Sequence, residues 1–546
     1  MLTPFVKFLV LRGYGFAHPE VAFLFVFPCA AALLLTFFIS LRPETLKPAL
    51  FGLLFLAFIY SELKPSILEF INGWSLMAVN EKPALVSIVL LMFAAIMGLA
   101  WMLRENIDII ITTFFGVILV TTVMFSSKPP ATWNIRNGPR ITADRSLPPV
   151  VHIILDEQIG INGLPREITG GKELREDLRG FYKKYGFTLY PRAFTHFRKT
   201  IESIPNLLNQ KVQPEAFKAL TLYDDFNLLT ENAWFDKLAK AGYSIDVFQT
   251  QYLDFCGKPG TSIAPINKCS TYNLSDVRFF HGMDISYATK GKLLFDYIIK
   301  VDFEDFLLVA LLLQHRLREV LGPALPEWNF QSISPSPLVS MEAVSKLSER
   351  ISTLKNGEAV FAHIILPHDP YVFDRQCRLL DVSEWAVRST DQRVGFPWGA
   401  LWRVKVGDTP EYWTFRYHAY LEQVRCIHTK LGEILDVMRA QGTYEGSTII
   451  IHSDHGSRIF TFHVNADNEK TIPERDLIAN YSTLFAVKKA GLAPGVSMDQ
   501  RSIQDLFAEL LMEKNGVETH GDIFFKPNKG DVGPDQIRLP MMTMRP

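Results

Sequence analysis

Carboxylates and a histidine follow two short apolar runs that lie far apart in the chain. The run Val-Val-His-Ile-Ile-Leu leads into Asp156 and Glu157, and the run Thr-Ile-Ile-Ile-His-Ser leads into Asp454 and His455. Short β-branched runs are typical of strands buried on both faces of a parallel sheet. Ligands bind beyond the carboxyl ends of such strands, where acids and imidazoles can hold a metal. Taken alone, Asp454 and His455 could equally cap the following loop.

A hydroxyl residue at a predicted helix start completes this set. Thr200 opens the segment Thr-Ile-Glu-Ser-Ile-Pro-Asn-Leu-Leu-Asn, where the early Pro205 fits a first helical turn. A hydroxyl is a weak nucleophile unless a metal or a base activates it, and a helix N-terminus favours an anionic substrate. Asp156, Thr200, Asp454 and His455 therefore predict one divalent metal site, with zinc or manganese preferred and calcium or magnesium possible. The chemistry predicted is in-line attack of Thr200 on a phosphate ester.

Strand and helix patterns alternate through the polar part of the chain. Val360–Leu366 is a further strand-like run, and it leads into His368. Helical periodicity covers 171–185 and 411–439. The order strand, helix, strand predicts an α/β fold with a mainly parallel sheet between helices.

Apolar segments in the first quarter of the chain predict a transmembrane helical bundle. The segments 21–41, 83–103 and 109–125 are long enough or nearly long enough to span a bilayer, and 46–63 is a weaker fourth candidate. The predicted organisation is a transmembrane region at 1–127, a linker at 128–149, a catalytic domain at 150–515 and a C-terminal tail at 516–546.

Charge and cysteine content narrow the partners and the compartment. The formal net charge is -1 with 21% charged residues, so no nucleic-acid partner is expected. Of the five cysteines, Cys29 falls in a predicted span, which leaves Cys256, Cys269, Cys377 and Cys426 in the polar part. We expect two disulfides and hence a periplasmic or extracytoplasmic catalytic domain; four unrelated buried thiols are the alternative.

The motifs around Asp156, Thr200 and Ser-Asp-His-Gly resemble the alkaline phosphatase superfamily in its sulfatase-domain branch. They are most similar to membrane-anchored lipoteichoic acid synthases and to phosphoglycerol and phosphoethanolamine transferases. The resemblance implies that Asp156, Asp454 and His455 are metal ligands and that Thr200 is both ligand and nucleophile. Glu157 matches the second acid of the sulfatases and is a candidate further ligand. His368 resembles the histidine that contacts the substrate phosphate.

One departure from the sulfatase pattern concerns the residue that sulfatases convert to formylglycine. That motif is Cys/Ser-x-Pro-x-Arg, and here Ser203 is followed by Pro205 but then by Leu207 in place of arginine. Ser203 therefore ranks second to Thr200. The expected function is a metal-dependent phosphotransferase or hydrolase in the inner membrane, acting on a phospholipid or other phosphodiester donor with a glycan or lipid acceptor. A sulfatase and a catalytically inactive membrane binding protein are the alternatives.

Several other polar residues have a structural interpretation. Three histidines inside apolar strands, His152, His363 and His452, are interpreted as hydrogen-bonded core residues. The charges beside Thr200, on Lys199 and Glu202, are interpreted as ordinary helix-start charges. Two residues beyond Gly456, Arg458 and His463, are candidates for binding phosphate oxygens.

Overall fold

The computed structural model describes most of the polar part of the chain and some of its apolar first quarter. The described residues are 3–41, 43, 94–95, 98, 102, 107–125, 131–139, 141–212, 220–223, 226–257, 263–302, 334–385, 390–395, 401–406, 410–459, 473–512, 522–524 and 536–538. They belong to two compact units. The N-terminal unit contains Met1–Pro130, Val277–Ile333 and Thr390–Val406, and the sheet unit contains Ala131–Asp276, Ser334–Ser389 and Gly407–Pro546.

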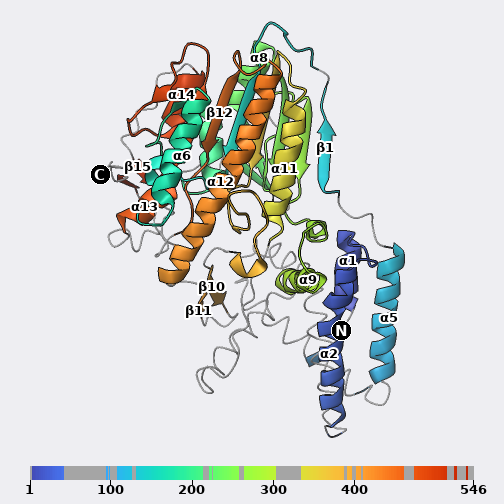
Figure 1. The fold of residues 1–546 in the computed structure, drawn as a ribbon. Helices are drawn as coiled ribbons and strands as arrows, with labels where there is room; N and C mark the ends of the chain where they lie inside the picture. Colours follow the sequence, from blue (N-terminus) through green and yellow to red (C-terminus); the bar gives the residue numbers. More distant parts are fainter. Residues whose placement is uncertain are drawn as a thin grey trace, which may run out of the picture. The chain divides into compact units, whose positions relative to one another are not determined.

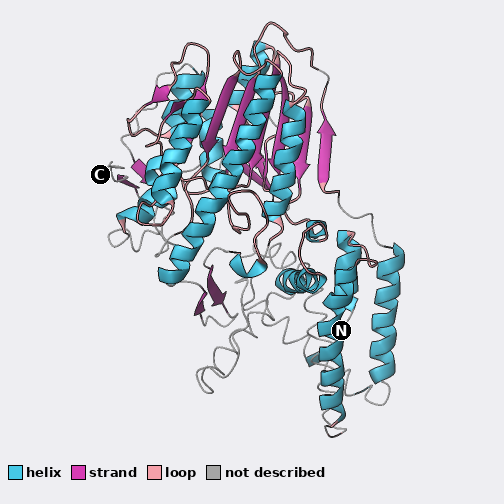
Figure 2. Cartoon of the chain, viewed as in Figure 1, coloured by secondary structure: helices cyan, strands magenta, loops and turns pink. Residues whose placement is uncertain are grey.

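The sheet unit is built around a sheet of nine described strands (Figures 1 and 2). Their order is β1-β8-β6-β9-β2-β12-β13-β3-β14. Their bounds are Trp133–Asn137 (β1), Lys268–Tyr272 (β8), Ser244–Thr250 (β6), Glu358–Ile364 (β9), Val150–Leu155 (β2), Thr448–Ser453 (β12), Phe485–Lys488 (β13), Thr188–Leu189 (β3) and Gly495–Val496 (β14). Strands β8, β6, β9, β2 and β12 run parallel to one another, whereas β1 and β13 pair antiparallel with their neighbours.

The centre of the sheet brings distant parts of the sequence to one edge. Strand β2 lies between β9 and β12, and its last residue, Leu155, pairs in register with Ile364 and Ser453. All six residues of β2 are buried, as expected for a strand covered on both faces. Because the three strands are parallel, the residues that follow them emerge side by side. The predicted α/β fold with a mainly parallel sheet is confirmed in this unit.

Helices lie on both faces of the sheet (Figure 1). One face packs against α7 (Thr200–Asn209), α8 (Ala233–Ala241) and α14 (Ile503–Met512), whose apolar side chains share a core cluster with strand residues such as Ile154, Phe361 and Ile450. On the other face lie α6 (Gly171–Lys184), α11 (Ser336–Ile351) and α12 (Pro410–Ala440). Helix α13 (Glu474–Tyr481) precedes β13.

Shorter elements complete the description of the sheet unit. The segment 128–149, predicted as a linker, contributes strand β1 at the sheet edge. The predicted tail contributes a pair of short antiparallel strands. The remaining bounds are Leu220–Tyr223 (β4), Phe226–Leu229 (β5), Leu253–Asp254 (β7), Asp522–Phe524 (β15), Gln536–Arg538 (β16), and the 3-10 turns Ile161–Gly163 (η2) and Val382–Glu384 (η6).

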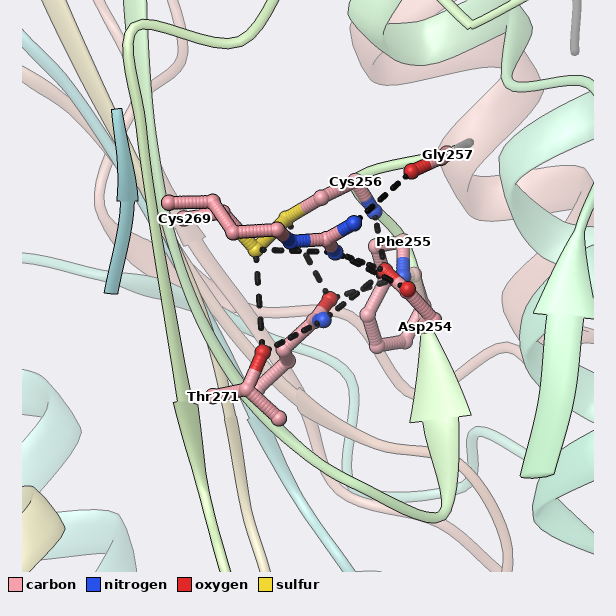
Figure 3. Close-up of a disulfide and its surroundings, with 8 residues drawn as sticks. Asp254, Phe255, Cys256, Gly257, Cys269 and Thr271 are labelled. Carbon is pink, nitrogen blue, oxygen red and sulfur yellow. Dashed lines mark hydrogen bonds and ion pairs between the residues drawn. A yellow bond between two sulfur atoms is a disulfide. The ribbon is translucent and has the colours of Figure 1, made fainter. Parts of the chain in front are cut away.

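Two disulfides form in the sheet unit, as predicted from the cysteine count. Cys256 pairs with Cys269, and Cys377 pairs with Cys426. Figure 3 shows the first of them, where Cys269 lies on β8 and Cys256 follows β7. Beside it Arg136 on β1 donates to Asp254 at 2.9 Å and to the Gly257 carbonyl at 3.0 Å. The disulfide links β8 to the chain that follows β7, and the ion pair of Arg136 links the edge strand β1 to β7.

The N-terminal unit combines the start of the chain with two segments that interrupt the predicted catalytic domain. Its described elements are α1 (Thr3–Arg12), α2 (Pro19–Ser40), α5 (Ile107–Phe125), the 3-10 turn η4 (Val277–Phe280), α9 (Tyr287–Asp302), β10 (Thr390–Gly395) and β11 (Leu401–Val406). Helix α9 packs along α2, and β10 pairs antiparallel with β11.

Two of the four predicted spans coincide with described helices. The segment 21–41 matches α2, and 109–125 matches α5. The segment 46–63 lies outside the described residues, as does most of 83–103. Within the described part of the chain, the structure has no helix with both the length and the apolar character needed to cross a membrane.

Candidate active site

The carboxyl end of β2 presents Asp156 and Glu157 at the centre of the sheet edge. The Asp156 amide donates to the Ile364 carbonyl at 3.0 Å, which extends the pairing of β2 with β9 by one residue. Glu157 then adopts a left-handed backbone conformation with φ 63°, so the chain turns away from the strand. Both acidic side chains are buried, Asp156 with 2% and Glu157 with 0% of its surface exposed. Burial of two carboxylates at a strand end calls for cationic partners.

The adjacent strand β12 supplies Asp454 and His455. The Asp454 Oδ1 atom accepts from the backbone amides of His455 at 2.8 Å and Glu157 at 3.2 Å, whereas its buried Oδ2 has no hydrogen-bond partner. His455 Nδ1 lies 2.7 Å from the Gly456 carbonyl. Because a carbonyl only accepts, Nδ1 carries the proton and Nε2 keeps a lone pair. That Nε2 lies 3.3 Å from Asp454 Oδ2 and 3.8 Å from Asp156 Oδ1.

Glycine is needed directly after this histidine. A Cβ atom built at Gly456 would lie 2.0 Å from the Ala479 carbonyl oxygen and 2.8 Å from that of Ser482. Both contacts are with backbone atoms, which cannot move aside as a flexible side chain can. The close approach of this turn to the end of α13 therefore sets the position of His455.

Helix α7 brings Thr200 to the same place. Thr200 is the first residue of the helix and is 3% exposed, and its Oγ1 lies 3.4 Å from His455 Nε2. Ser203, one turn along, is held differently: its hydroxyl donates to the Asp454 carbonyl at 2.6 Å and lies 2.9 Å from Thr195 Oγ1. The hydroxyl beside the carboxylates is thus that of Thr200, while Ser203 bonds to the backbone behind them.

A second group of charges adjoins this cluster. His368 Nε2 lies 3.4 Å from Glu157 Oε1, and its Nδ1 lies 3.3 Å from Asp369 Oδ1. Arg458 Nε lies 3.1 Å from the same Glu157 oxygen, and another Arg458 nitrogen lies 3.3 Å from His455 Nε2. Two cationic side chains therefore flank the carboxylates at the site.

His363 is a residue of the site that sequence reasoning assigned to the core. It lies near the end of β9, is fully buried, and places Nε2 3.4 Å from Asp156 Oδ2. Atoms of Asp156, His363 and Asp454 suitable as metal ligands all lie within 4.8 Å of one another. Its apolar neighbours in the sequence hid this role. The sequence did offer one signal for this role. His363 lies close to His368 in the sequence and strand β9 ends between them, so both histidines lie near the strand end where the site forms.

The other residues weighed from the sequence lie nearby or in the interior. Lys199 and Glu202 form an ion pair at 3.6 Å in the first turn of α7. His152 and His452 contact each other, with 2.8 Å between their Nε2 atoms, as expected for core histidines. His463 lies outside the described residues.

The two aspartates differ in their electrostatic surroundings. Burial and the negative charge of Asp156 raise the pKa of Asp454 to about 7. Burial alone would raise the pKa of Asp156 as well, but the neighbouring imidazoles of His363, His368 and His455 hold it well below its ordinary value. Without a cation between them, Asp156 is stable as an anion, whereas Asp454 ionises less readily.

The pKa values of His455 and His368 are shifted in opposite directions. Burial, reinforced by the charge of Arg458, lowers the pKa of His455 to about 4, so this imidazole is neutral at pH 7. Burial would also lower the pKa of His368, but the charges of Glu157, Asp369 and Asp156 outweigh it and raise this pKa to about 9. His455 is therefore suited to bind a metal, and His368 is suited to bind an anion.

The predicted ligand set fits a divalent cation. Asp156 Oδ1 and Asp454 Oδ2 are buried oxygens without hydrogen-bond partners, and both face the lone pair of His455 Nε2. Two carboxylates, a neutral imidazole and a hydroxyl are the ligand types found in zinc and manganese sites. A second set of ligand atoms within 4.8 Å comprises Asp156, Glu157 and His368. The structure thus brings Asp156, Glu157, Thr200, His368, Asp454 and His455 together, as the sequence predicted.

Comparisons with known proteins identify similar solved structures. No protein-family model and no curated protein sequence matches the chain. Among the solved structures, a 2-O GAG sulfatase is similar at 11% identity and a TM-score of 0.39, with 69% of this chain and 78% of that chain covered. The lipoteichoic acid synthase LtaP from Listeria monocytogenes gives 12% and 0.35, with 67% and 71% covered. The C-terminal periplasmic domain of EptC from Escherichia coli, in complex with Zn, gives 11% and 0.34, with 70% and 85% covered. All three belong to the alkaline phosphatase superfamily, which the sequence motifs also resemble.

Proposed function

We propose that this chain is a metal-dependent phosphotransferase or phosphohydrolase of the alkaline phosphatase superfamily that acts on phosphodiesters through Thr200. The observation that carries the proposal is the position of the Thr200 hydroxyl, 3.4 Å from His455 Nε2 beside Asp156 and Asp454. The neighbouring hydroxyl of Ser203 is committed to the Asp454 carbonyl and Thr195. Thr200 is therefore the hydroxyl available for reaction.

Residues of three elements would hold the cation. Asp156 from β2, Asp454 and His455 from β12, and Thr200 from α7 converge there, with Glu157 adjoining. A bound divalent ion acts as a Lewis acid and favours the alkoxide form of a hydroxyl that it contacts. The neutral His455 and the anionic Asp156 are already in the protonation states that ligands require.

The chain's own groups define the rest of the proposed reaction. A bond forms between Thr200 Oγ1 and the substrate phosphorus, and the bond from phosphorus to the departing alcohol oxygen breaks. The proton of the Thr200 hydroxyl ends on that alcohol. His368, protonated at pH 7 because its pKa is raised to about 9, and Arg458 offer positive charge to the phosphate oxygens. Water or an acceptor hydroxyl then attacks the phosphothreonine and restores Thr200.

The donor and the location form part of the same proposal. We propose a phospholipid donor, a glycan or lipid acceptor, and a chain anchored in the inner membrane with the sheet unit on the periplasmic side. Apolar segments such as 83–103 in the sequence support the anchor, and the two disulfides support an oxidising compartment. Anchoring keeps the catalytic groups close to a lipid substrate.

The experiment compares Thr200→Ala with Ser203→Ala as its matched control. Detergent-purified protein is assayed for release of head groups from fluorescent phosphatidylglycerol and phosphatidylethanolamine, and for hydrolysis of an aryl phosphate and an aryl sulfate. We expect phosphate-ester turnover to fall at least about 10³-fold in Thr200→Ala and less than about tenfold in Ser203→Ala.

Two other outcomes would overturn the proposal. Sulfate release that survives Thr200→Ala but not Ser203→Ala would make the chain a sulfatase. Bound zinc and manganese below one equivalent, together with no turnover of any of the four substrates, would make it an inactive binding protein.

Head-group release with trapping of phosphate on Thr200, detected by mass spectrometry, would establish the covalent step.

A further inference from the structure

A second group of histidines and a carboxylate lies in the N-terminal unit, within a part of the chain that the catalytic proposal does not use. It consists of His18 in the turn before α2, Glu20 in the first turn of α2, and His281 just after η4. One ligand-type atom from each residue lies within 4.8 Å of the other two. We propose that these three residues bind a divalent transition metal, with zinc as the ion of choice, which fastens α2 to the segment around α9.

Glu20 is the central residue of this cluster. Its side chain is 0% exposed, although it belongs to a residue type that is almost never fully buried without partners. One carboxylate oxygen, Oε1, accepts from the Tyr14 hydroxyl at 2.7 Å and lies 2.8 Å from His281 Nδ1. The other oxygen, Oε2, is buried without a hydrogen-bond partner. A contact between the helices made by hydrogen bonds uses Oε1 alone and leaves Oε2 buried without a partner. Coordination of a metal ion by Glu20 would give Oε2 a partner as well.

The two imidazoles are held face to face beside this carboxylate. The rings of His18 and His281 are stacked, with centroids 3.7 Å apart and planes inclined by 28°. The ring of His18 fits against the preceding turn because residue 15 is glycine: a Cβ atom at Gly15 would lie 2.8 Å from His18 Nε2. Lys290 donates to the His281 carbonyl at 2.6 Å and so fixes the backbone of that residue. Each imidazole is therefore positioned by contacts outside the cluster.

Close helix packing delivers His281 to Glu20. A Cβ atom at Gly291 of α9 would lie 2.7 Å from the Glu20 carbonyl oxygen and 2.7 Å from Phe23 Cβ. The absence of a side chain at Gly291 lets α9 approach the first turn of α2 more closely than any other residue would allow. Two segments that are distant in the sequence, one with His18 and Glu20 and the other with His281, then meet at one point.

Two histidines and one glutamate form a recognised set of zinc ligands. Zinc binds imidazole nitrogen at about 2.0–2.1 Å and carboxylate oxygen at about 2.0–2.2 Å, so ligands in a tetrahedral site lie about 3.3 Å apart. The ligand-type atoms, all within 4.8 Å of one another, need to close by at most about 1.5 Å to reach that separation. The side chain of His281 is 46% exposed, so water has access for the fourth position. Because His18 and Glu20 belong to one segment and His281 to another that is distant in the sequence, such an ion acts as a crosslink.

The test counts bound Zn²⁺ in the full chain with the catalytic ligands removed. Asp156→Asn combined with Asp454→Asn serves as the background, so that an ion at the active site does not contribute. Detergent-purified protein is stripped with EDTA, reloaded with Zn²⁺, desalted and analysed by elemental mass spectrometry. We expect this background to keep one equivalent of Zn²⁺ and to lose it when either His18→Ala or His281→Ala is added.

Two further variants separate metal binding from folding. Glu20→Gln keeps an oxygen that accepts from Tyr14 but removes the carboxylate, and we expect it to lose the Zn²⁺ equivalent while its circular dichroism is unchanged. Tyr14→Phe removes a neighbour but no ligand, and we expect it to keep the equivalent. Zinc that is absent from the background, or that persists in both histidine variants, would overturn the proposal. Loss of zinc in Glu20→Gln is decisive even if the histidine variants misfold.

Discussion

His152 and His452 form an interior pair on the sheet face that also carries His363, but only His363 contacts the candidate active site. Ile154 pairs in register with both His363 and His452, and paired residues of parallel strands point to the same face. The interior pair bond to each other among aromatic rings, whereas His363 contacts Asp156. The same residue type in the same apolar setting is thus structural in the pair His152 and His452 and belongs to the site in His363. His363 and His452 are each the second-last residue of their strands, β9 and β12, so the partner that each side chain contacts, and not its distance from the strand end, separates the two roles.

The largest effect on turnover is expected from removing a negative charge at the carboxyl ends of the central strands. In Asp454→Asn the amide oxygen still accepts from the backbone amides of Glu157 and His455, but the anionic ligand is lost. We expect phosphodiester turnover to fall at least about 10³-fold, or about 4 kcal/mol in the barrier. Because Asp454 is destabilised by Asp156, the unfolding midpoint measured in EDTA should not fall. A variant that keeps wild-type turnover would remove Asp454 from the mechanism.

A smaller loss of activity is expected from His363→Gln. This side chain contacts Asp156 at 3.4 Å and holds the carboxylate anionic, so its removal should disturb metal affinity and turnover together. The expected loss is about 10–100-fold in either quantity. Measuring Zn²⁺ affinity alongside kcat distinguishes positioning from a purely structural role, which would change stability and leave affinity intact.

The interior counterpart, His152→Phe, should have the opposite profile. His452 donates from Nδ1 to the Ser453 carbonyl, so its Nε2 accepts a hydrogen bond from His152 Nε2. Phenylalanine would leave that buried acceptor unpaired, at a cost of about 1–3 kcal/mol in the free energy of unfolding. Turnover should stay within about threefold of wild type, because His152 contacts His452, Trp234 and Phe361, which the proposed reaction does not use. Equilibrium denaturation and the phosphodiester assay together test this prediction. A large loss of turnover with unchanged stability would contradict the structural role assigned to His152.

The smallest expected effect concerns the pH dependence of stability and another buried histidine, His428 on α12. Its Nδ1 lies 2.9 Å from the Val424 carbonyl and donates to it, so Nε2 accepts from the Tyr182 hydroxyl, and this second bond requires a neutral ring. Burial lowers the pKa of His428 to about 4, below the unfolded value of about 6.5. The unfolded chain therefore binds the proton more readily, and stability present above pH 6.5 is lost as the pH falls toward 4.

At pH 5.5 this linkage amounts to about 1.4 kcal/mol. We expect the stability difference between wild type and His428→Gln to shrink by that amount between pH 7.5 and pH 5.5, as measured by urea denaturation. A difference that stays constant with pH would show that His428 does not remain neutral in the folded protein.

The sequence by itself identified the residues of the candidate site and the order of its elements. Apolar runs ending in Asp156 and Asp454 marked two strand ends, because short β-branched apolar runs are typical of strands buried on both faces. Thr200 marked a helix start, and the even number of cysteines indicated two crosslinks. These features are local, so they can be read from neighbouring residues alone.

Only the tertiary structure decided which groups meet. Strand order places β2 between β9 and β12, and this brings His363 to Asp156 although nothing in its own segment is polar enough to reveal it. Packing of α7 decided that Thr200, and not Ser203, faces the carboxylates. The contact between His281 and Glu20 depends on the close approach of α9 to α2 at Gly291. Each of these contacts joins distant segments, and register and packing, which a local pattern does not encode, determine their geometry.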